Sequence, residues 1–317
     1  MRRRPWLTGA AAALAVALVA GACGGGGGTK KKAASTSAPT FPAGSTMAAL
    51  QAKGKITVGT KFDQPGFGQK NPTTGQVEGF DVEIAKLIAV GIFGGTPQSV
   101  ASKINFQEAV SAVRESVIES NTVDLVVATY TINDTRKQRV AFAGPYYLAH
   151  QDTMVKKDDD TIKSVTDLNG KKVCTVAGST SEKNLRAKAP QAEVTLLPTY
   201  SQCAEELSNG RVVAETTDAP ILAGLVQQSN GAFKLINAPF TDEPYGIGLK
   251  KGDQAFRDFL NNTLEKIEKD GQWATAYKDT LGKLGLATPQ PPPIDRYPDT
   301  GGTAATTVAS TTTTAKP

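Results

Sequence analysis

The chain has 317 residues, of which 39% are hydrophobic and 21% charged, so it is not globally disordered and has room for about two domains. Its formal net charge is +5, but Arg2, Arg3 and Arg4 supply three of the 35 basic residues and leave 32 against 30 acidic ones. No basic stripe with interleaved aromatic residues occurs, so the composition does not favour nucleic acid as a partner.

The N-terminal segment has the features of an export signal. Three arginines precede an apolar stretch at residues 7–22, whose 16 residues fall short of the roughly 20 that span a bilayer. Small residues before Cys23 resemble a bacterial lipobox, so we expect a lipoprotein signal peptide at 1–22 and lipid on Cys23. A plain secretory signal with a chance cysteine is the alternative, and the Sec and twin-arginine routes both stay open.

The segments that flank the central chain have the composition of tethers. Residues 23–52 begin with a glycine run at 24–28 and are expected to form a lipidated flexible linker. Residues 289–317 are rich in proline and threonine, and we expect a disordered tail because few apolar side chains are available for packing.

Between the tethers, apolar periodicity predicts alternating strands and helices. Strands are expected at 55–60, 124–129, 153–156, 172–176, 193–197 and 212–216. Helices are expected at 80–92, 108–119, 181–188, 201–209, 219–228, 254–270 and 273–281. This order predicts an α/β protein with mostly parallel sheets covered by helices, in which a ligand lies at the carboxyl ends of strands.

Polar residues follow the apolar run at 125–128. Thr129 and Thr131 share one face of an extended segment, and Arg136 follows five residues later. A guanidinium group beside hydroxyl groups suits a small carboxylate, which it can bind with two parallel hydrogen bonds. A strand end followed by a capped helical turn is the alternative.

Two further polar clusters stand at predicted strand–helix junctions. Ser179 and Thr180 open a helix, where free backbone N–H groups form an anion site or the hydroxyl simply caps the helix. Asp218 ends a strand and either caps the next helix or accepts hydrogen bonds from a ligand ammonium. With Arg136, these groups suit a free α-amino acid.

After Cys23, the only cysteines are Cys174 and Cys203. In an exported protein an isolated pair favours a disulfide, with two buried free thiols as the alternative. His150 is the only histidine, which excludes a zinc site of the histidine-rich kind, and no metal or cofactor is expected.

Six segments carry a resemblance to a known family: KITVGT at 55–60, GFDVEIA at 79–85, TINDTR at 131–136, GPYY at 144–147, GST at 178–180 and TDA at 217–219. In this order they resemble the bacterial family 3 extracellular solute-binding proteins, the polar-amino-acid receptors of ABC importers. The resemblance implies a two-lobed periplasmic-binding-protein fold of type II, in which each lobe is a mixed, mostly parallel sheet flanked by helices and the lobes close on the ligand by hinge motion. Lobe 1 would comprise 53–147 and 244–288, and lobe 2 would comprise 148–243.

The resemblance also implies roles for individual residues. Arg136 would grip the α-carboxylate of the ligand, assisted by Thr131 and the backbone near Thr129. Ser179 and Thr180 would be the partners from lobe 2, and Asp218 would bind the ammonium group.

Ligand specificity is expected to depend on Lys61, Ser111 and Arg114. The stretch Ser111–Arg114 resembles the Ser-x-x-Arg of acidic-amino-acid receptors, and two cations near the ligand would need a second carboxylate to balance them. We therefore expect L-glutamate, with L-aspartate as a second ligand. If Lys61 and Arg114 are solvated surface charges, glutamine or asparagine is the alternative.

The family further implies a non-enzymatic monomer that works with the permease and ATPase subunits of an importer, anchored to the outer face of the cell membrane by lipid on Cys23. Two other functions stay open. One is a secreted enzyme like the cyclohexadienyl dehydratases, and the other is a ligand-sensing module for a separate signalling partner.

Overall fold

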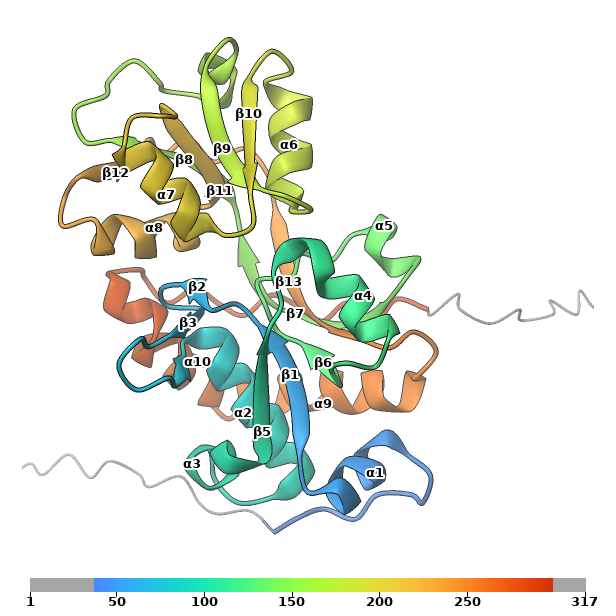
Figure 1. The fold of residues 1–317 in the computed structure, drawn as a ribbon. Coiled ribbons are helices and arrows are strands. Elements are labelled where there is room, and N and C mark those ends of the chain that lie inside the picture. Colours follow the sequence, from blue (N-terminus) through green and yellow to red (C-terminus); the bar gives the residue numbers. More distant parts are fainter. Residues whose placement is uncertain (1–36, 299–317) are drawn as a thin grey trace, which may run out of the picture. The chain divides into compact units, whose positions relative to one another are not determined.

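The computed structural model describes residues 37–298 (Figure 1). The expected signal peptide at 1–22, the lipidation site Cys23 and the chain after Pro298 lie outside the described residues. In the part that is described, no helix has both the length and the apolar character that a membrane span requires.

Two five-stranded sheets form the framework. The first has the order β5 (Ile104–Glu108), β1 (Ile56–Thr60), β6 (Leu125–Val126), β13 (Glu243–Leu249) and β7 (Ala141–Ala149). The second has the order β10 (Glu193–Leu197), β9 (Lys172–Val176), β11 (Ala214–Asp218), β8 (Gln151–Lys156) and β12 (Phe233–Leu235). In each sheet the first three strands are parallel and the other two pairings are antiparallel, so the α/β class and the mixed sheets are confirmed, with less parallel pairing than expected.

Helices cover both sheets (Figure 1). The first sheet has α1 (Thr46–Lys53), α2 (Phe80–Phe93), α3 (Pro97–Val100), α4 (Arg114–Glu119), α5 (Asp134–Lys137), α9 (Gln254–Lys269) and α10 (Gln272–Asp279). The second has α6 (Thr180–Lys188), α7 (Tyr200–Ser208) and α8 (Ala219–Gln228). A small sheet of β2 (Asp63–Gln64), β3 (Gly68–Lys70) and β4 (Val77–Glu78) follows β1, and short 3₁₀ helices span 101–103, 111–113, 165–168 and 281–284.

The chain passes between the two sheets through adjoining strands. Strand β7 ends at Ala149 and β8 begins at Gln151, so only His150 separates them. The return passes through β13, whose first residue Glu243 pairs with Ala149. The two connections are therefore held together by strand pairing and share one place in the fold.

Strands β5, β7 and β13 of the first sheet were not predicted from the sequence, and three predicted elements differ clearly in extent. The predicted helix at 108–119 begins only at Ser111, because Glu108 still pairs with Thr60 as the last residue of β5. The predicted strand at 124–129 pairs only at 125–126, since Thr129 adopts a left-handed conformation with φ of 44°. The predicted strand at 212–216 lies two residues later, where Asp218 pairs with Gln151.

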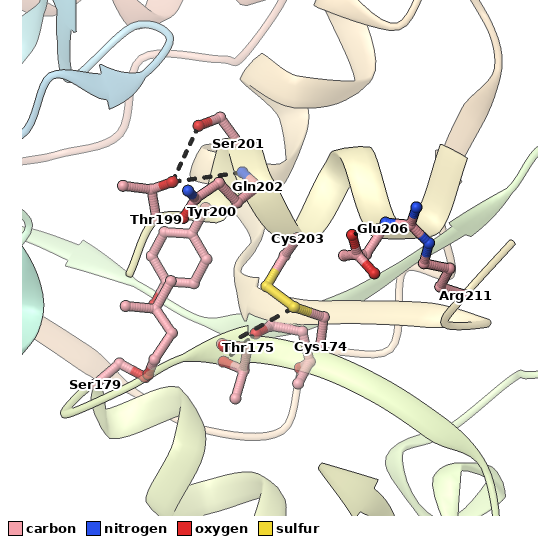
Figure 2. The surroundings of a disulfide bond; sticks show 12 residues. Cys174, Thr175, Ser179, Thr199, Tyr200, Ser201, Gln202, Cys203, Glu206 and Arg211 are labelled. Carbon is pink, nitrogen blue, oxygen red and sulfur yellow. Dashed lines mark hydrogen bonds and ion pairs between the residues drawn. A yellow bond between two sulfur atoms is a disulfide. The ribbon is translucent and has the colours of Figure 1, made fainter. Parts of the chain in front are cut away.

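The predicted disulfide between Cys174 and Cys203 is confirmed. Cys174 lies on β9 and Cys203 on α7, and Figure 2 shows the bond linking the helix to the strand below it. Both cysteines are fully buried. The bond therefore fixes α7, which begins at Tyr200, against the second sheet.

The expectation of a structureless linker at 23–52 is wrong for the part that the structure describes. Helix α1 lies within it, and the Gln51 side chain donates a hydrogen bond of 2.7 Å to the Ile92 carbonyl. Phe41 packs edge-on against Phe259 of α9, with ring centroids 5.4 Å apart. Together with the buried Met47 and Leu50, these side chains attach a segment whose overall composition is small and polar.

The expectation of a disordered tail from residue 289 is likewise wrong as far as residue 298. The Tyr297 hydroxyl accepts a hydrogen bond of 2.7 Å from the Phe142 N–H, and the Tyr297 ring lies 4.0 Å from Lys137 Nζ. The Asp295 N–H donates to the Gly144 carbonyl at 2.8 Å, and Ile294 packs against the core. We call residues 291–298 the C-terminal strap.

We expect a chain that ends at Gln290 to lose stability although the family resemblance ends earlier. Half-burial of Ile294 and Tyr297 contributes about 2 kcal/mol in total on the usual scale for large apolar side chains. Urea unfolding of this chain and of a matched chain that ends at Pro298 measures the difference. Equal unfolding midpoints would show that the strap contributes nothing to stability.

Candidate functional site

Polar side chains from both sheets meet beyond the carboxyl ends of the parallel strands. Lys61 directly follows β1, Thr129 and Thr131 follow β6, Gly178 follows β9 and Asp218 ends β11. Every residue expected at the site is buried except Thr180, which is partly exposed. The structure therefore brings these sequence-distant segments to one place.

Arg136 connects segments from both sheets. Helix α5 carries it, and this helix begins where the Asn133 side chain accepts a hydrogen bond from the Arg136 N–H. The Arg136 guanidinium donates to the Thr131 carbonyl at 2.7 Å and to the Gly178 carbonyl at 3.4 Å. Its Nε lies 3.3 Å from Glu115 Oε1. Burial lowers the pKa of Arg136 to about 10, with repulsion from Arg114 as the second cause.

Thr131 and Thr180 face each other, with their hydroxyl oxygens 3.3 Å apart. Thr131 also donates a hydrogen bond of 2.7 Å to Glu243 Oε2. The other oxygen of Glu243 accepts from Asn184 at 2.8 Å. Glu243 is a member of this cluster that the sequence analysis missed, although it begins β13, next to the position expected for the return between lobes.

Ser179 and Thr180 play different parts. The Ser179 hydroxyl caps α6 by accepting from the Glu182 N–H at 3.0 Å, and it donates to the Val176 carbonyl at 2.7 Å. The alternative of a helix cap is therefore right for the Ser179 side chain, because its hydroxyl both accepts and donates a hydrogen bond within the turn. The Thr180 hydroxyl instead reaches Thr131, at the contact between the two sheets' segments.

Asp218 is a buried carboxyl group with one free oxygen. The Tyr245 hydroxyl donates to Oδ2, whereas Oδ1 is buried and has no hydrogen-bond partner among the described residues. Burial raises the pKa of Asp218 to about 7, and the negative charge of Glu243 adds to the shift. A cation placed at Oδ1 would favour the ionised form. The alternative of an N-cap is wrong for this side chain, since it makes no capping hydrogen bond to α8.

Lys61, Ser111 and Arg114 form a second buried group. Lys61 is 1% exposed and Arg114 is 2% exposed, so the alternative of solvated surface charges is wrong. Lys61 Nζ donates to Ser111 Oγ at 2.9 Å. Arg114 Nη1 donates to the Ala128 carbonyl at 2.9 Å and lies 3.2 Å from the Thr129 carbonyl. No ion pair of Lys61 or Arg114 occurs among the residues that the structure describes.

Both arginines lie close to the ring of Tyr130. The guanidinium carbon of Arg114 is 4.3 Å from the centroid of the Tyr130 ring, and that of Arg136 is 4.9 Å away. An aromatic face attracts each cation without neutralising it. The site therefore concentrates three buried basic groups, and Glu115 is the acid that pairs directly with one of them.

Thr129 is positioned by residues that the sequence analysis did not identify. Its N–H donates to Asp81 Oδ2 at 2.8 Å, and the Tyr146 hydroxyl donates to the other Asp81 oxygen at 2.6 Å. Its hydroxyl lies 3.1 Å from Gln64 Oε1 and 2.8 Å from the Ala128 carbonyl. Asp81 thus fixes the left-handed turn at Thr129 from 48 residues away. The available sequence clue was Asp81 inside the apolar start of a predicted helix.

Segments of the two sheets touch closely on either side of the site. A Cβ atom on Gly178, which has φ of 73°, would lie 2.8 Å from Ala112 Cα, and one on Gly224 would lie 2.6 Å from the Pro65 carbonyl oxygen. The Tyr200 N–H donates to Asp63 Oδ2 at 2.8 Å. Any side chain at these two glycines would separate the segments, so glycine is required for the observed approach.

The site's chemistry is that of binding polar groups. Within residues 37–298, no group of three or more His, Cys, Asp and Glu side chains is arranged to hold a metal ion. Its basic side chains can bind carboxylates, the carboxyl group of Asp218 can bind an ammonium group, and its hydroxyls can donate or accept hydrogen bonds. Together they can hold both ends of a small zwitterion and one further anionic group.

Comparisons with known proteins give a consistent result. The family model "Bacterial extracellular solute-binding proteins, family 3" matches residues 56–283. "Glutamate-binding protein GluB" of Corynebacterium glutamicum is 40% identical over 255 residues, which cover 78% of this chain and 85% of the relative. "ABC transporter glutamine-binding protein GlnH" of Bacillus subtilis is 42% identical over 234 residues, which cover 74% and 83%. A solved structure, "the ancestral amino acid-binding protein AncCDT-1, a precursor of cyclohexadienyl dehydratase", has a TM-score of 0.67 and 31% identity and covers 75% of this chain and 100% of that one.

Proposed function

This chain belongs to family 3 of the bacterial extracellular solute-binding proteins and has their two-lobed type II fold, and we propose that it captures an acidic amino acid for an ABC importer. L-glutamate is the proposed ligand, and L-aspartate is the second. Lobe 1 comprises 53–147 and 244–288, lobe 2 comprises 148–243, and the ligand is enclosed when the lobes close about the paired connections.

One observation carries the choice of an acidic ligand. Lys61 and Arg114 are buried, and neither has an ion pair within the described part of the chain. Burying a charge without a counter-charge is costly, so a ligand that brings a second carboxylate beside these groups is favoured over one that brings a cation. The relatives named for glutamate agree with this choice.

The remaining groups suit the invariant part of an amino acid. Arg136 is assigned to the α-carboxylate, because it is buried and already joins segments of both lobes. Thr131 and Thr180 assist from opposite lobes, and the free oxygen of Asp218 is assigned to the ammonium group. Ser111 supports Lys61, and Ser179 and Thr129 shape the backbone around the ligand.

Glutamine is the other candidate ligand. Relatives named for glutamine match this chain as well as those named for glutamate do. A carboxamide can accept hydrogen bonds from Lys61 and Arg114 through its oxygen, but it brings no negative charge to these two basic groups. We therefore place glutamine second.

The proposed role is binding without chemical change. A dehydratase-like activity would need an acid or base poised at the ligand, and Asp218 is assigned to the ammonium group. We further propose that lipid on Cys23 anchors the protein outside the cell membrane and that a permease and an ATPase receive the ligand. Partnership with a separate signalling receptor is the alternative.

Calorimetric titration of the exported chain tests the ligand. We expect the tightest binding with L-glutamate, weaker binding with L-aspartate and L-glutamine, and no binding of L-lysine or L-arginine, because a cationic side chain would meet Lys61 and Arg114. Recovery of unchanged glutamate afterwards supports a binding role. Tight binding of glutamine without a response to glutamate would overturn the proposal, and tight lysine binding would overturn the whole assignment of the side-chain site.

A further inference from the structure

We propose that, above neutral pH, Lys61 takes up a proton when an acidic ligand binds and stays neutral when the corresponding amide binds, so that one site accepts both ligands in a pH-dependent ratio. This inference deepens the proposed function and rests on it. It assigns to Lys61 the discrimination between a side-chain carboxylate and a carboxamide, and it predicts a proton balance that differs between the two.

The surroundings of Lys61 are compatible with either protonation state. Its Nζ is buried, its hydrogen-bond partner is Ser111 Oγ at 2.9 Å, and the Tyr200 ring lies 6.0 Å away. A serine hydroxyl accepts from an ammonium and can rotate to donate to a neutral amine. A neutral amine can in turn accept from a carboxamide N–H, whereas an ammonium can only donate. The Lys61–Ser111 pair can therefore match a carboxylate in one state and an amide in the other.

Charges from five other elements face Lys61. Arg114 on α4 and Arg136 on α5 disfavour its protonation, and Asp63 on β2 and Glu108 on β5 favour it. Lys61 also acts on the carboxyl group of Asp81 on α2. Burial is the largest cause and Arg114 the second, and together they lower the pKa of Lys61 to about 7.

A ligand carboxylate beside Lys61 would favour the ammonium and raise its pKa. The contribution of Lys61 to glutamate affinity should therefore be complete at pH values below about 7, where Lys61 is already protonated, and should fall by up to tenfold per unit at higher pH. An amide brings no charge, so glutamine affinity gains nothing from protonation of Lys61. The preference for glutamate over glutamine should shrink as the pH rises.

Asp218 titrates in the same range and must be separated from this effect. Its pKa is raised to about 7, so the ammonium of any amino acid ligand would expel a proton from it. Glutamate and glutamine share that ammonium group. The difference between their proton balances cancels the contribution of Asp218 and isolates Lys61.

The test is calorimetry of the exported chain in buffers of different ionisation enthalpy, with glutamate and glutamine, at pH 6 and pH 8. At pH 8, glutamate should take up about one proton more than glutamine, and at pH 6 the difference should be close to zero. Lys61→Arg keeps the charge and should abolish the difference at both pH values. Lys61→Met should abolish it too and should lower the glutamate preference, whereas Lys70→Met, which removes an exposed lysine over Phe62, should change neither.

Equal proton balances at pH 8, with glutamate still bound tightly, would overturn this inference and leave the proposed function intact. Persistence of the difference in Lys61→Arg would assign the proton to another group and also overturn it. Absence of glutamate binding at both pH values would instead overturn the proposed function itself.

Discussion

Replacement of Arg136 by alanine is expected to abolish binding of every amino acid, acidic or amide. The α-carboxylate would enter a buried site without its guanidinium partner, and leaving one member of a buried ion pair unpaired costs roughly 3–5 kcal/mol. That corresponds to a loss of affinity of about 10²–10⁴-fold. Titration with glutamate and glutamine measures the loss, which should be similar for both ligands because they share the α-carboxylate.

Arg139→Ala is the matched control for that experiment. Arg139 lies three residues further along the chain, is exposed, and pairs with Glu119 on the surface. Its removal should leave affinity unchanged. Arg136 also donates a hydrogen bond to the Thr131 carbonyl, so its removal could affect folding. Thermal unfolding therefore checks that the Arg136→Ala protein is folded. A folded Arg136→Ala protein that binds glutamate normally would show that the α-carboxylate lies elsewhere.

Removal of the disulfide is expected to cause the largest loss of stability. The bond joins residues separated by 29 positions, and closing a loop of that length stabilises a protein by about 3–4 kcal/mol in the chain-entropy model. The double variant Cys174→Ala with Cys203→Ala should therefore unfold at markedly lower urea concentration. Cys23→Ser, which removes a cysteine outside the described residues, is the control and should unfold like the parent chain.

The same double variant should still bind its ligand under conditions where it is folded. The cysteines are not among the residues assigned to the ligand, although α7, which the bond fixes, contributes the Tyr200 N–H to Asp63. A loss of unfolding free energy smaller than about 1 kcal/mol would mean that strain in the native state or residual structure in the unfolded state offsets the stabilisation expected from the disulfide.

The sequence alone located every strand of the second sheet except β12, but only β1 and β6 of the first sheet. The elements it found are those whose apolar spacing is local. The strands at 172–176 and 193–197 and the helix at 219–228 agree with the structure to the residue. It also located Arg136 and Asp218 close to the ends of apolar strands. Ligands of such sheets bind at those strand ends, so the local pattern was informative.

The supporting residues could not be found in this way. Asp81 and Glu243 act on Thr129 and Thr131 across 48 and 112 positions, and no spacing rule connects partners so far apart. The left-handed turn at Thr129 was missed for the same reason, because a distant carboxylate stabilises it rather than a local glycine. Tertiary hydrogen bonds thus determine the conformation of this segment, which local propensity does not predict.

The flanking segments were misjudged because average composition hides single anchors. Between residues 289 and 317 the apolar content is low, yet Ile294 and Tyr297 pack the strap against the core, and hydrogen bonds of Asp295 and Arg296 add to this attachment. The same holds for Phe41 on the N-terminal side. The apolar content of a segment therefore predicts whether it can form its own core, and it does not predict whether the segment adheres to an existing one.

These anchors determine how the protein can be trimmed for engineering. A recombinant fragment limited to residues 56–283 would omit Phe41 and Tyr297, leaving Phe259 uncovered and the Phe142 amide without the hydroxyl that accepts its hydrogen bond. Such a fragment would expose apolar surface that favours aggregation during purification. A fluorescent amino-acid reporter built from this chain should therefore span at least 37–298, with its reporter groups attached outside both flanks.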